Sequence, residues 1–300
     1  MSVAAAPVAA TSVAAAAAAI AGRVERTPFV HSPDFSALAG CEVHLKLENL
    51  QRTGAFKLRG AMARLLALDG VERARGVVTA SAGNHGQGVA VAAAMLAIRV
   101  CVVLPRGVPL AKLTAIQRAG ADVVVTGDGY DEAFAAAREL AAQRGAVYIH
   151  AFDDPTVIAG QGTVAREMLE DLPDLDAIVV PVGGGGLAAG VAIAVSGARP
   201  AARVVGAQAE TLAAFAASLA AGYRVEPGPA QTMADGIAVA KPGELAFSVL
   251  SELADRIVTV SEENLSRALL LCLERAKQLV EPAGAAAVAA LLESDAAEDL

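Results

Sequence analysis

Short apolar runs rich in β-branched residues alternate with longer alanine- and leucine-rich segments along most of the chain. The short runs have the length and composition of strands, and the longer segments have the spacing of helices. Strands are therefore predicted over residues 43–48, 76–79, 100–104, 122–126, 147–150, 177–181, 203–207 and 257–260. Helices are predicted over residues 13–21, 58–68, 85–97, 110–119, 130–144, 156–169, 187–195, 212–220, 262–279 and 282–292.

This alternation predicts the fold class. Strands that are apolar throughout and that alternate with helices form parallel sheets whose two faces are both covered. We therefore predict an α/β fold with mostly parallel sheets. In such sheets ligands bind beyond the carboxyl ends of the strands, so the loops that follow the strands are the candidate functional regions.

The composition excludes several classes of partner. The 300 residues carry a formal net charge of -8, which argues against a nucleic-acid surface and against adhesion to anionic membranes. No apolar run is long enough to span a membrane, and the alanine-rich residues 1–21 lack the positive start of a leader peptide. We expect a cytoplasmic protein. No Cys/His cluster with metal-ligand spacing is present, so no metal site is predicted.

One lysine stands at a strand-to-helix junction. Lys57 follows the predicted strand 43–48 and the break at Thr53-Gly54, and it lies between Phe56 and Leu58. Burial among apolar neighbours disfavours the charged amine and lowers its pKa. A neutral amine is what a lysine needs to attack a carbonyl and form a Schiff base. Taken alone, the stretch fits a surface lysine better, because most lysines are solvated.

The first candidate anion site follows the strand 76–79. This loop reads Ser81-Ala82-Gly83-Asn84-His85-Gly86 and leads into a predicted helix. Backbone N–H groups and the positive end of the helix suit a small anion, while Ser81 and Asn84 add a hydroxyl and an amide. An ordinary helix N-cap with a glycine turn explains the loop equally well.

The second candidate anion site contains four consecutive glycines. It follows the strand 177–181 and reads Val182-Gly183-Gly184-Gly185-Gly186-Leu187. Four glycines are costly in chain entropy, and they are typical of backbone that wraps closely around a phosphate. The loop matches neither the Walker A pattern nor the dinucleotide fingerprint. Here a bound ligand explains the sequence better than a flexible loop does.

The three features together are more specific than any one of them. A phosphate loop, a loop suited to a carboxylate and a lysine suited to a Schiff base describe pyridoxal 5'-phosphate and an amino acid. The cofactor brings a phosphate and an aldehyde, and the substrate brings the carboxylate. We therefore predict this cofactor and a small amino-acid substrate.

The same residues resemble the signatures of fold-type II pyridoxal-phosphate enzymes. They are Thr53 to Ala61, Ser81 to Gly86 and Gly183 to Leu187. The sequence is most similar to threonine ammonia-lyases (threonine dehydratases), with serine racemases and serine dehydratases as relatives. Further landmarks of the dehydratases are found at Thr232 to Val239 and Val280 to Ala285.

The resemblance implies the architecture and the activity. It implies two three-layer domains, a large one from residues 1–53 and 149–300 and a small one from residues 54–148. It implies conversion of L-threonine, and of L-serine, to 2-oxobutyrate or pyruvate and ammonia. It also implies a homo-oligomer, either a dimer or a tetramer.

The resemblance further implies roles for individual residues. Lys57 carries the cofactor and then acts as the base, Phe56 packs beside the cofactor ring, and Asn84 bonds its phenolic oxygen. Ser81 is implied as a second catalytic residue on the opposite face. The residues implied to bind the cofactor phosphate are Gly183, Gly184, Gly185, Gly186 and Leu187. Gly236 and Glu281 are implied to line the cofactor site. The residues implied to bind the substrate carboxylate are Ser81, Ala82, Gly83, Asn84 and His85.

Three departures from the family pattern change the expectations. Gln208 and Ala214 stand where some members have acidic metal ligands, so we expect no metal there. A final strand with a Ser-Gly-Gly-Asn segment, whose serine serves the pyridine nitrogen, is absent from the 300 residues. We expect no regulatory domain after the catalytic one, and hence no feedback by isoleucine or valine through such a domain.

Other functions are compatible with parts of the sequence. A serine or aspartate-type racemase uses the same scaffold, and the pocket for the substrate side chain would decide between the two. A cofactor-binding but inactive partner subunit fits the absent final strand, yet Lys57, Ser81, Asn84 and the four glycines argue against it. A nucleotide-binding module is weakened because both nucleotide patterns fail.

Overall fold

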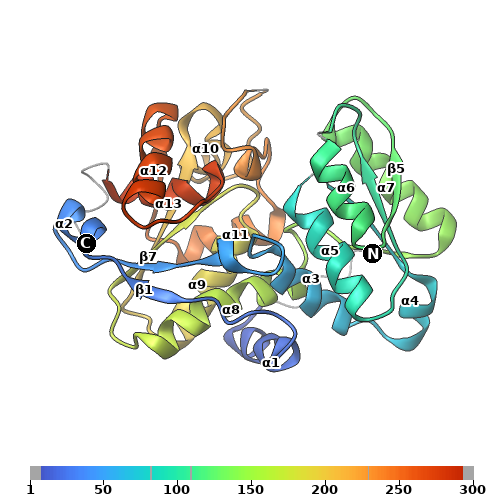
Figure 1. The fold of residues 1–300 in the computed structure, drawn as a ribbon, viewed down its shortest axis with the longest axis horizontal. Helices are drawn as coiled ribbons and strands as arrows, with labels where there is room; N and C mark the ends of the chain where they lie inside the picture. Colours follow the sequence, from blue (N-terminus) through green and yellow to red (C-terminus); the bar gives the residue numbers. More distant parts are fainter. Residues whose placement is uncertain (1–7, 82, 109, 229, 293–300) are drawn as a thin grey trace.

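The computed structural model describes residues 8–81, 83–108, 110–228 and 230–292. Figure 1 shows two lobes, with helix α3 (Lys57–Leu66) running between them. Helix α1 (Ala10–Ile20) packs on both, because Val13 belongs to the core of one lobe and Ala16 and Ile20 belong to the core of the other. Both lobes are three-layered, with a parallel sheet between two layers of helices.

One lobe is built on a four-stranded parallel sheet in the order β5-β4-β3-β6. Side chains of alternate residues point to opposite faces of a strand, so Val77 and Val78 enter different cores. Helices α5 and α6 cover the first face, with α3 packed on α5 in the same core, and α7 covers the second. The elements are β3 (Val77–Ala80), β4 (Val100–Leu104), β5 (Asp122–Val125), β6 (Val147–Tyr148), α4 (Gly70–Arg75), α5 (Asn84–Met95), α6 (Leu110–Arg118) and α7 (Tyr130–Arg144).

The other lobe is built on a three-stranded parallel sheet in the order β7-β8-β9. Helices α8, α9 and α11 share a core with Ile178 and Val180 on one face, while α12 and α13 share a core with Ala207 and Val260 on the other. The elements are β7 (Ala177–Pro181), β8 (Arg203–Ala209), β9 (Arg256–Val260), α8 (Pro155–Asp171), α9 (Gly186–Ala198), α10 (Ala214–Ala221), α11 (Glu244–Leu253), α12 (Glu262–Glu274) and α13 (Pro282–Leu292), with 3-10 turns η2 (Glu210–Leu212) and η3 (Asp235–Ile237).

An antiparallel pair lies beside this second sheet. Strand β1 (Phe29–His31) pairs with β2 (His44–Lys46), with α2 (Pro33–Ala39) between them and the turn η1 (Glu48–Leu50) after them. The sequence pattern predicts a longer strand over 43–48 and no strand before it. The structure corrects both points, because the backbone leaves the extended form after Lys46 to enter η1, and because β2 finds its partner in β1.

The prediction of a helix over residues 262–279 is wrong beyond Glu274. Lys277 takes a positive φ of 56°, and the Gln278 N–H donates to the Cys272 carbonyl at 2.9 Å. A left-handed residue with a backward hydrogen bond is a common way for a helix to end. As a result the chain from Gln278 to Glu281 is irregular and lies outside the helix.

The predicted α/β fold with mostly parallel sheets is confirmed. Both candidate loops leave the carboxyl ends of parallel strands, the first after β3 and the second after β7. None of the helices in the described ranges has both the length and the apolar character needed to cross a bilayer.

Candidate active site

Lys57 is the first residue of α3, as the strand-to-helix pattern predicts. Its side chain is half-buried. The Nζ atom donates to the Ala151 carbonyl at 3.0 Å and lies 5.2 Å from the centre of the Phe56 ring. Burial lowers the pKa of this amine to about 8, and the negative charge of Glu281 opposes the shift. A much larger share of the amine is therefore neutral near pH 7 than in an exposed lysine.

A buried ion-pair network fixes the start of α3. Arg59, two residues after Lys57, is 0% exposed. Its guanidinium donates to Glu48 Oε1 at 2.8 Å and to Glu167 Oε1 at 2.6 Å, and Lys46 Nζ donates to Glu167 Oε2 at 2.6 Å. Burial alone would lower the pKa of Arg59, but the two carboxylates raise it. This network ties α3 to α8 and to η1, and so holds the backbone that carries Lys57.

The four-glycine loop is packed against the protein at every position. A Cβ added at Gly184 would lie 2.5 Å from the Phe152 ring, and one at Gly185 would lie 2.5 Å from Phe215. The same holds for Gly183 and Gly186, where the nearest protein atoms would be 3.0 and 2.7 Å away. Glycine is therefore required by protein packing on one side of this loop.

The other property of this loop is its polar backbone. Gly185 precedes α9 with a φ of 91°, in the left-handed region that favours glycine. The first N–H groups of a helix have no partners within it, and the dipole places partial positive charge there. Leu187 packs its side chain against the core, so this residue offers the loop only its backbone.

The loop after β3 presents side chains. Ser81 is buried, and its Oγ accepts the Gly83 N–H at 3.2 Å. His85 is also buried, with Nε2 3.3 Å from the Ile149 carbonyl. Burial lowers the pKa of His85 to about 3, and the charge of Lys57 contributes to the shift. Ala82 lies outside the described residues.

The structure brings the predicted residues of both lobes together. The Asn84 side-chain amide donates to Glu281 Oε1 at 2.8 Å and to Oε2 at 3.0 Å. A Cβ at Gly236 would lie 3.4 Å from Glu281 Oε1. A Cβ at Gly88, on α5, would lie 3.2 Å from the backbone of Lys57. Thus the helix that follows the Ser81 loop packs directly on the start of α3.

The sequence matches a known family over almost all of its length. Residues 20–300 match the model for "Pyridoxal-phosphate dependent enzyme". The chain belongs to this family. The predicted family membership is therefore confirmed, and with it the expectation of pyridoxal phosphate as cofactor.

Individual relatives are similar at the level of sequence and of structure. The L-threonine ammonia-lyase of Thermotoga maritima is 49% identical over 90% of this chain and 67% of its own. The catabolic L-threonine dehydratase of Escherichia coli K12 is 44% identical over 91% of this chain and 83% of its own. A threonine deaminase from the organism abbreviated T.th. superposes with a TM-score of 0.91 at 41% identity, covering 96% of this chain and 94% of that one. Maize serine racemase superposes with a TM-score of 0.95 at 34% identity, covering 98% and 89%.

The residues of this family member fit pyridoxal phosphate. Lys57 is an amine with a lowered pKa, as attack on an aldehyde needs. The loop Gly183–Gly186 leads into the N-terminus of a 13-residue helix, as a phosphate needs. The Asn84 side-chain amide donates to Glu281, and it would bond a ring oxygen by exchanging this partner.

Sequence reasoning missed the chain between β6 and α8. The carbonyl that accepts Lys57 Nζ belongs to Ala151, and the ring beside the glycine loop is Phe152. Polar residues follow this strand at its carboxyl end, at His150, Asp153 and Asp154. Position after a parallel strand is the signal that could have identified them.

The predicted absence of a metal stays a prediction. Gln208 is fully buried on β8, and its Oε1 accepts the backbone N–H groups of Phe215 and Ala216 at 3.1 Å each, at the start of α10. Ala214 is buried and has no ligating side-chain atom. Within the described ranges no group of three or more His, Cys, Asp or Glu side chains could hold a metal.

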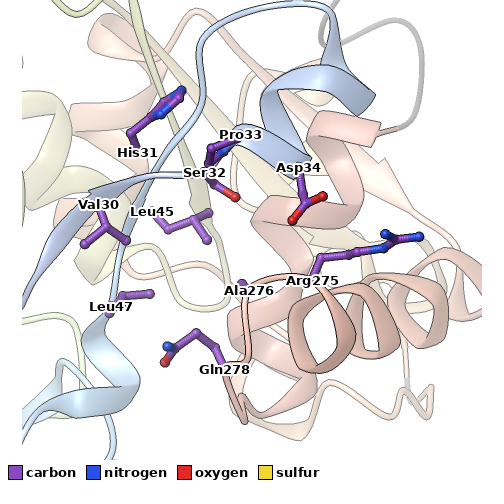
Figure 2. Close-up of a pocket in the computed structure, with 10 residues that line it drawn as sticks. All are labelled: Val30, His31, Ser32, Pro33, Asp34, Leu45, Leu47, Arg275, Ala276 and Gln278. Atoms are coloured by element: carbon purple, nitrogen blue, oxygen red, sulfur yellow. The ribbon is translucent and has the colours of Figure 1, made fainter.

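A surface pocket of about 180 Å³ lies elsewhere in the molecule, and Figure 2 shows its lining. It is formed by β1, the start of α2, β2 and the chain that follows α12. None of the predicted site residues lines it. Its lining residues are Val30, His31, Ser32, Pro33, Asp34, Leu45, Leu47, Arg275, Ala276 and Gln278.

Proposed function

We propose that this chain is a pyridoxal-phosphate dependent ammonia-lyase that converts L-threonine, and L-serine, to 2-oxobutyrate or pyruvate and ammonia. The observation that carries the proposal is 49% identity to an L-threonine ammonia-lyase over 90% of the chain. The lowered pKa of Lys57 and the two loops that follow β3 and β7 would supply the chemistry that this reaction needs.

The cofactor would be held from both lobes. Residues Gly183 to Leu187 would hold the phosphate through backbone N–H groups and the N-terminus of α9. Phe56 would pack beside the ring, and Asn84 would donate to its phenolic oxygen. Gly236 and Glu281 would line the same space, since both lie next to each other and Glu281 contacts Asn84. When bound, pyridoxal phosphate supplies an aldehyde for an amine and a ring that accepts the electron pair left at the substrate's α-carbon.

The remaining steps fall to residues of the chain itself. The neutral amine of Lys57 would hold the cofactor through its aldehyde, and the free amine would accept the substrate's α-proton on Nζ. Ser81, Gly83, Asn84 and His85 form the part of the loop that would bind the substrate carboxylate, with Ala82 between them. The Ser81 hydroxyl would donate or accept a proton on the opposite face. His85 stays neutral, so it does not add a competing positive charge beside Lys57.

We also infer how the chain is organised. Residues 1–53 and 149–300 would form the large domain, and residues 54–148 the small one, because the four-stranded sheet lies entirely in the second range. We infer a homo-oligomer, a dimer or a tetramer, that works in the cytoplasm. The cysteines Cys41, Cys101 and Cys272 are free thiols, as expected in a reducing compartment.

The test is a pair of substitutions at Lys57. Lys57→Ala removes the amine, and Lys57→Arg keeps a cation that stays protonated and cannot attack an aldehyde. Both variants should lose covalent cofactor attachment and at least about 1,000-fold in ammonia release. Lys241→Ala, which alters an exposed lysine, is the control and should retain activity.

The products decide between the lyase and the racemase. L-Threonine and L-serine are supplied to the wild-type chain, and 2-oxo acid, ammonia and the D-amino acid are measured together. The proposal expects equal amounts of 2-oxo acid and ammonia. Formation of D-serine without 2-oxo acid would make the chain a racemase, and cofactor binding without any product would make it an inactive subunit.

A further inference from the structure

The chain between β6 and α8 touches two parts of the proposed cofactor site, Lys57 and the glycine loop. Ala151 provides the carbonyl that accepts Lys57 Nζ at 3.0 Å. Phe152 fills the space beside Gly184, and its backbone fills the space beside Gly186, where an added Cβ would lie 2.7 Å from the Phe152 carbonyl oxygen. One short segment therefore spans from the lysine to the phosphate loop.

The same segment also anchors the start of α11 beside the loop. The Asp153 carboxylate accepts the backbone N–H groups of Glu244 and Leu245, at 2.9 Å each, at the start of α11. A Cβ added at Gly243 would lie 2.6 Å from Asp153 Oδ1, and the Gly243 N–H donates to the Gly184 carbonyl at 3.1 Å. Displacement of the segment would therefore disturb the glycine loop from two directions.

One side chain, that of His150, stabilises the backbone turn of this segment. The Nδ1 atom of His150 accepts the backbone N–H of Phe152 at 3.2 Å and that of Asp153 at 2.8 Å. Both partners are donors, so Nδ1 must be unprotonated and the proton of the neutral ring must be on Nε2. A proton on Nδ1 would remove both hydrogen bonds at once.

The surroundings of His150 favour the neutral ring. Three aromatic rings meet it edge-on, those of Phe134 at 5.9 Å, Tyr148 at 6.2 Å and Phe152 at 4.7 Å between ring centres. Burial lowers the pKa of His150. Among the charged groups that face it, two carboxylates oppose the shift and two cations reinforce it. The carboxylates are Asp153 and Asp154, and the cations are Lys57 and Arg138. His85, on α5, also faces the ring and is neutral.

We propose that His150 is a positioning residue of the cofactor site, whose unprotonated Nδ1 holds the turn that joins Lys57 to the glycine loop, and that protonation of Nδ1 weakens cofactor binding. The proposal rests on the proposed function only in that pyridoxal phosphate binds between Lys57 and the loop. It concerns binding of the cofactor and is independent of which reaction follows.

Two variants separate the hydrogen-bond role from the bulk of the ring. In His150→Asn the side-chain oxygen can accept the same two N–H groups, as in an Asx turn, and it does not titrate. In His150→Leu no acceptor remains. The cofactor dissociation constant, measured by titrating the apoenzyme with pyridoxal phosphate at pH 8, should rise about tenfold in His150→Leu. It should rise no more than about threefold in His150→Asn. Equal losses in the two variants would overturn the proposal.

The pH dependence gives a second test with a built-in control. The dissociation constants of wild type and His150→Asn are compared from pH 8 to pH 5, so the titrations that they share cancel in the ratio. Because burial lowers the pKa of His150, wild type should lose affinity relative to His150→Asn only well below about pH 6.5, the ordinary pKa of histidine. A constant ratio would overturn the proposal.

A measurement on the wild-type holoenzyme does not depend on how any variant folds. The chain has 4 histidines, so long-range ¹H–¹⁵N spectra of the imidazoles can be assigned to individual residues. At pH 8 the His150 ring should show an unprotonated Nδ1 and a protonated Nε2. The opposite tautomer would overturn the proposal, whether or not the enzyme forms 2-oxo acid.

Discussion

The two loops of the site follow the same plan but are packed differently. Each leaves a parallel strand and leads into a helix, with Gly185 before α9 and Gly83 before α5. Beside Gly184 the Phe152 ring fills the space that a Cβ would need, whereas beside Gly83 the described residues place no atom within 4 Å. The glycine loop is thus held by packing against other parts of the protein, while the loop after β3 leaves room beside Gly83.

The two loops also differ in the polar groups that they offer to a ligand. The glycine loop offers only backbone N–H groups, which suit a phosphate that must be held and not discriminated. The other loop adds Ser81 and Asn84, and it contains His85 in neutral form. On the proposed assignment of the two loops, rigid packing is found where the cofactor phosphate would bind, and open space with polar side chains is found where the substrate would bind.

Among substitutions in the two loops, the largest effect on cofactor affinity is expected from Gly184→Ala. The new methyl group would lie 2.5 Å from the Phe152 ring, and overpacking of this kind costs about 1–3 kcal/mol. Cofactor affinity should fall about 10- to 100-fold, measured by titration of the apoenzyme. The double variant with Phe152→Ala should recover part of the loss. Normal affinity in the single variant would contradict the packing of this loop.

Lowering the pH should destabilise the loop after β3, which contains His85, more than the glycine loop. Folding lowers the pKa of His85 from 6.5 to about 3, so the folded state binds fewer protons than the unfolded chain between these values. The stabilisation is complete above about pH 6.5 and is lost as the pH falls towards 3.

Urea unfolding at pH 7 and pH 4 measures this effect. Between pH 7 and pH 4, the free energy of unfolding of wild type should fall by on the order of a few kcal/mol more than that of His85→Gln. The same loss in both proteins would show that other groups are responsible.

Ser81→Ala removes one hydrogen bond from the second loop. The Gly83 N–H loses its 3.2 Å partner, which should lower the free energy of unfolding by about 1 kcal/mol. The KM for L-threonine should rise by a larger factor than the dissociation constant of the cofactor. A larger change in the dissociation constant of the cofactor than in the KM would mean that Ser81 serves cofactor binding and not substrate binding.

The smallest effect on stability is expected from Gly83→Ala. The φ of -138° is open to any residue, and no atom of the described residues obstructs the new methyl group. The melting temperature should stay within about 1 °C. The KM for L-threonine should nevertheless rise about tenfold, since the methyl group would enter the space proposed for the carboxylate. An unchanged KM would place the substrate elsewhere.

Much of the fold is visible in the sequence, because apolar runs such as 100–104 and 177–181 can be buried only in covered parallel sheets. The two loops are visible because they follow such runs. The end of α12 is not, since the apolar spacing continues to Leu279 while Lys277 already takes a left-handed φ.

The parts of the site that could not be predicted are contacts between residues far apart in the chain. The carbonyl of Ala151 has no side-chain signature, and its bond to Lys57 spans 94 positions. Asn84 and Glu281 are 197 positions apart. The reason for glycine at position 184 is a ring, that of Phe152, which only the tertiary structure brings there.

The most direct test of the account is to locate the cofactor on the chain. The holoenzyme is reduced with borohydride, digested with trypsin and analysed by mass spectrometry. We predict a modified peptide of residues 53–59, because trypsin cleaves after Arg52 and Arg59 but not after a modified Lys57. Modification of Lys46 or Lys241 instead, or an unmodified Lys57 in a protein that forms 2-oxobutyrate, would contradict the account.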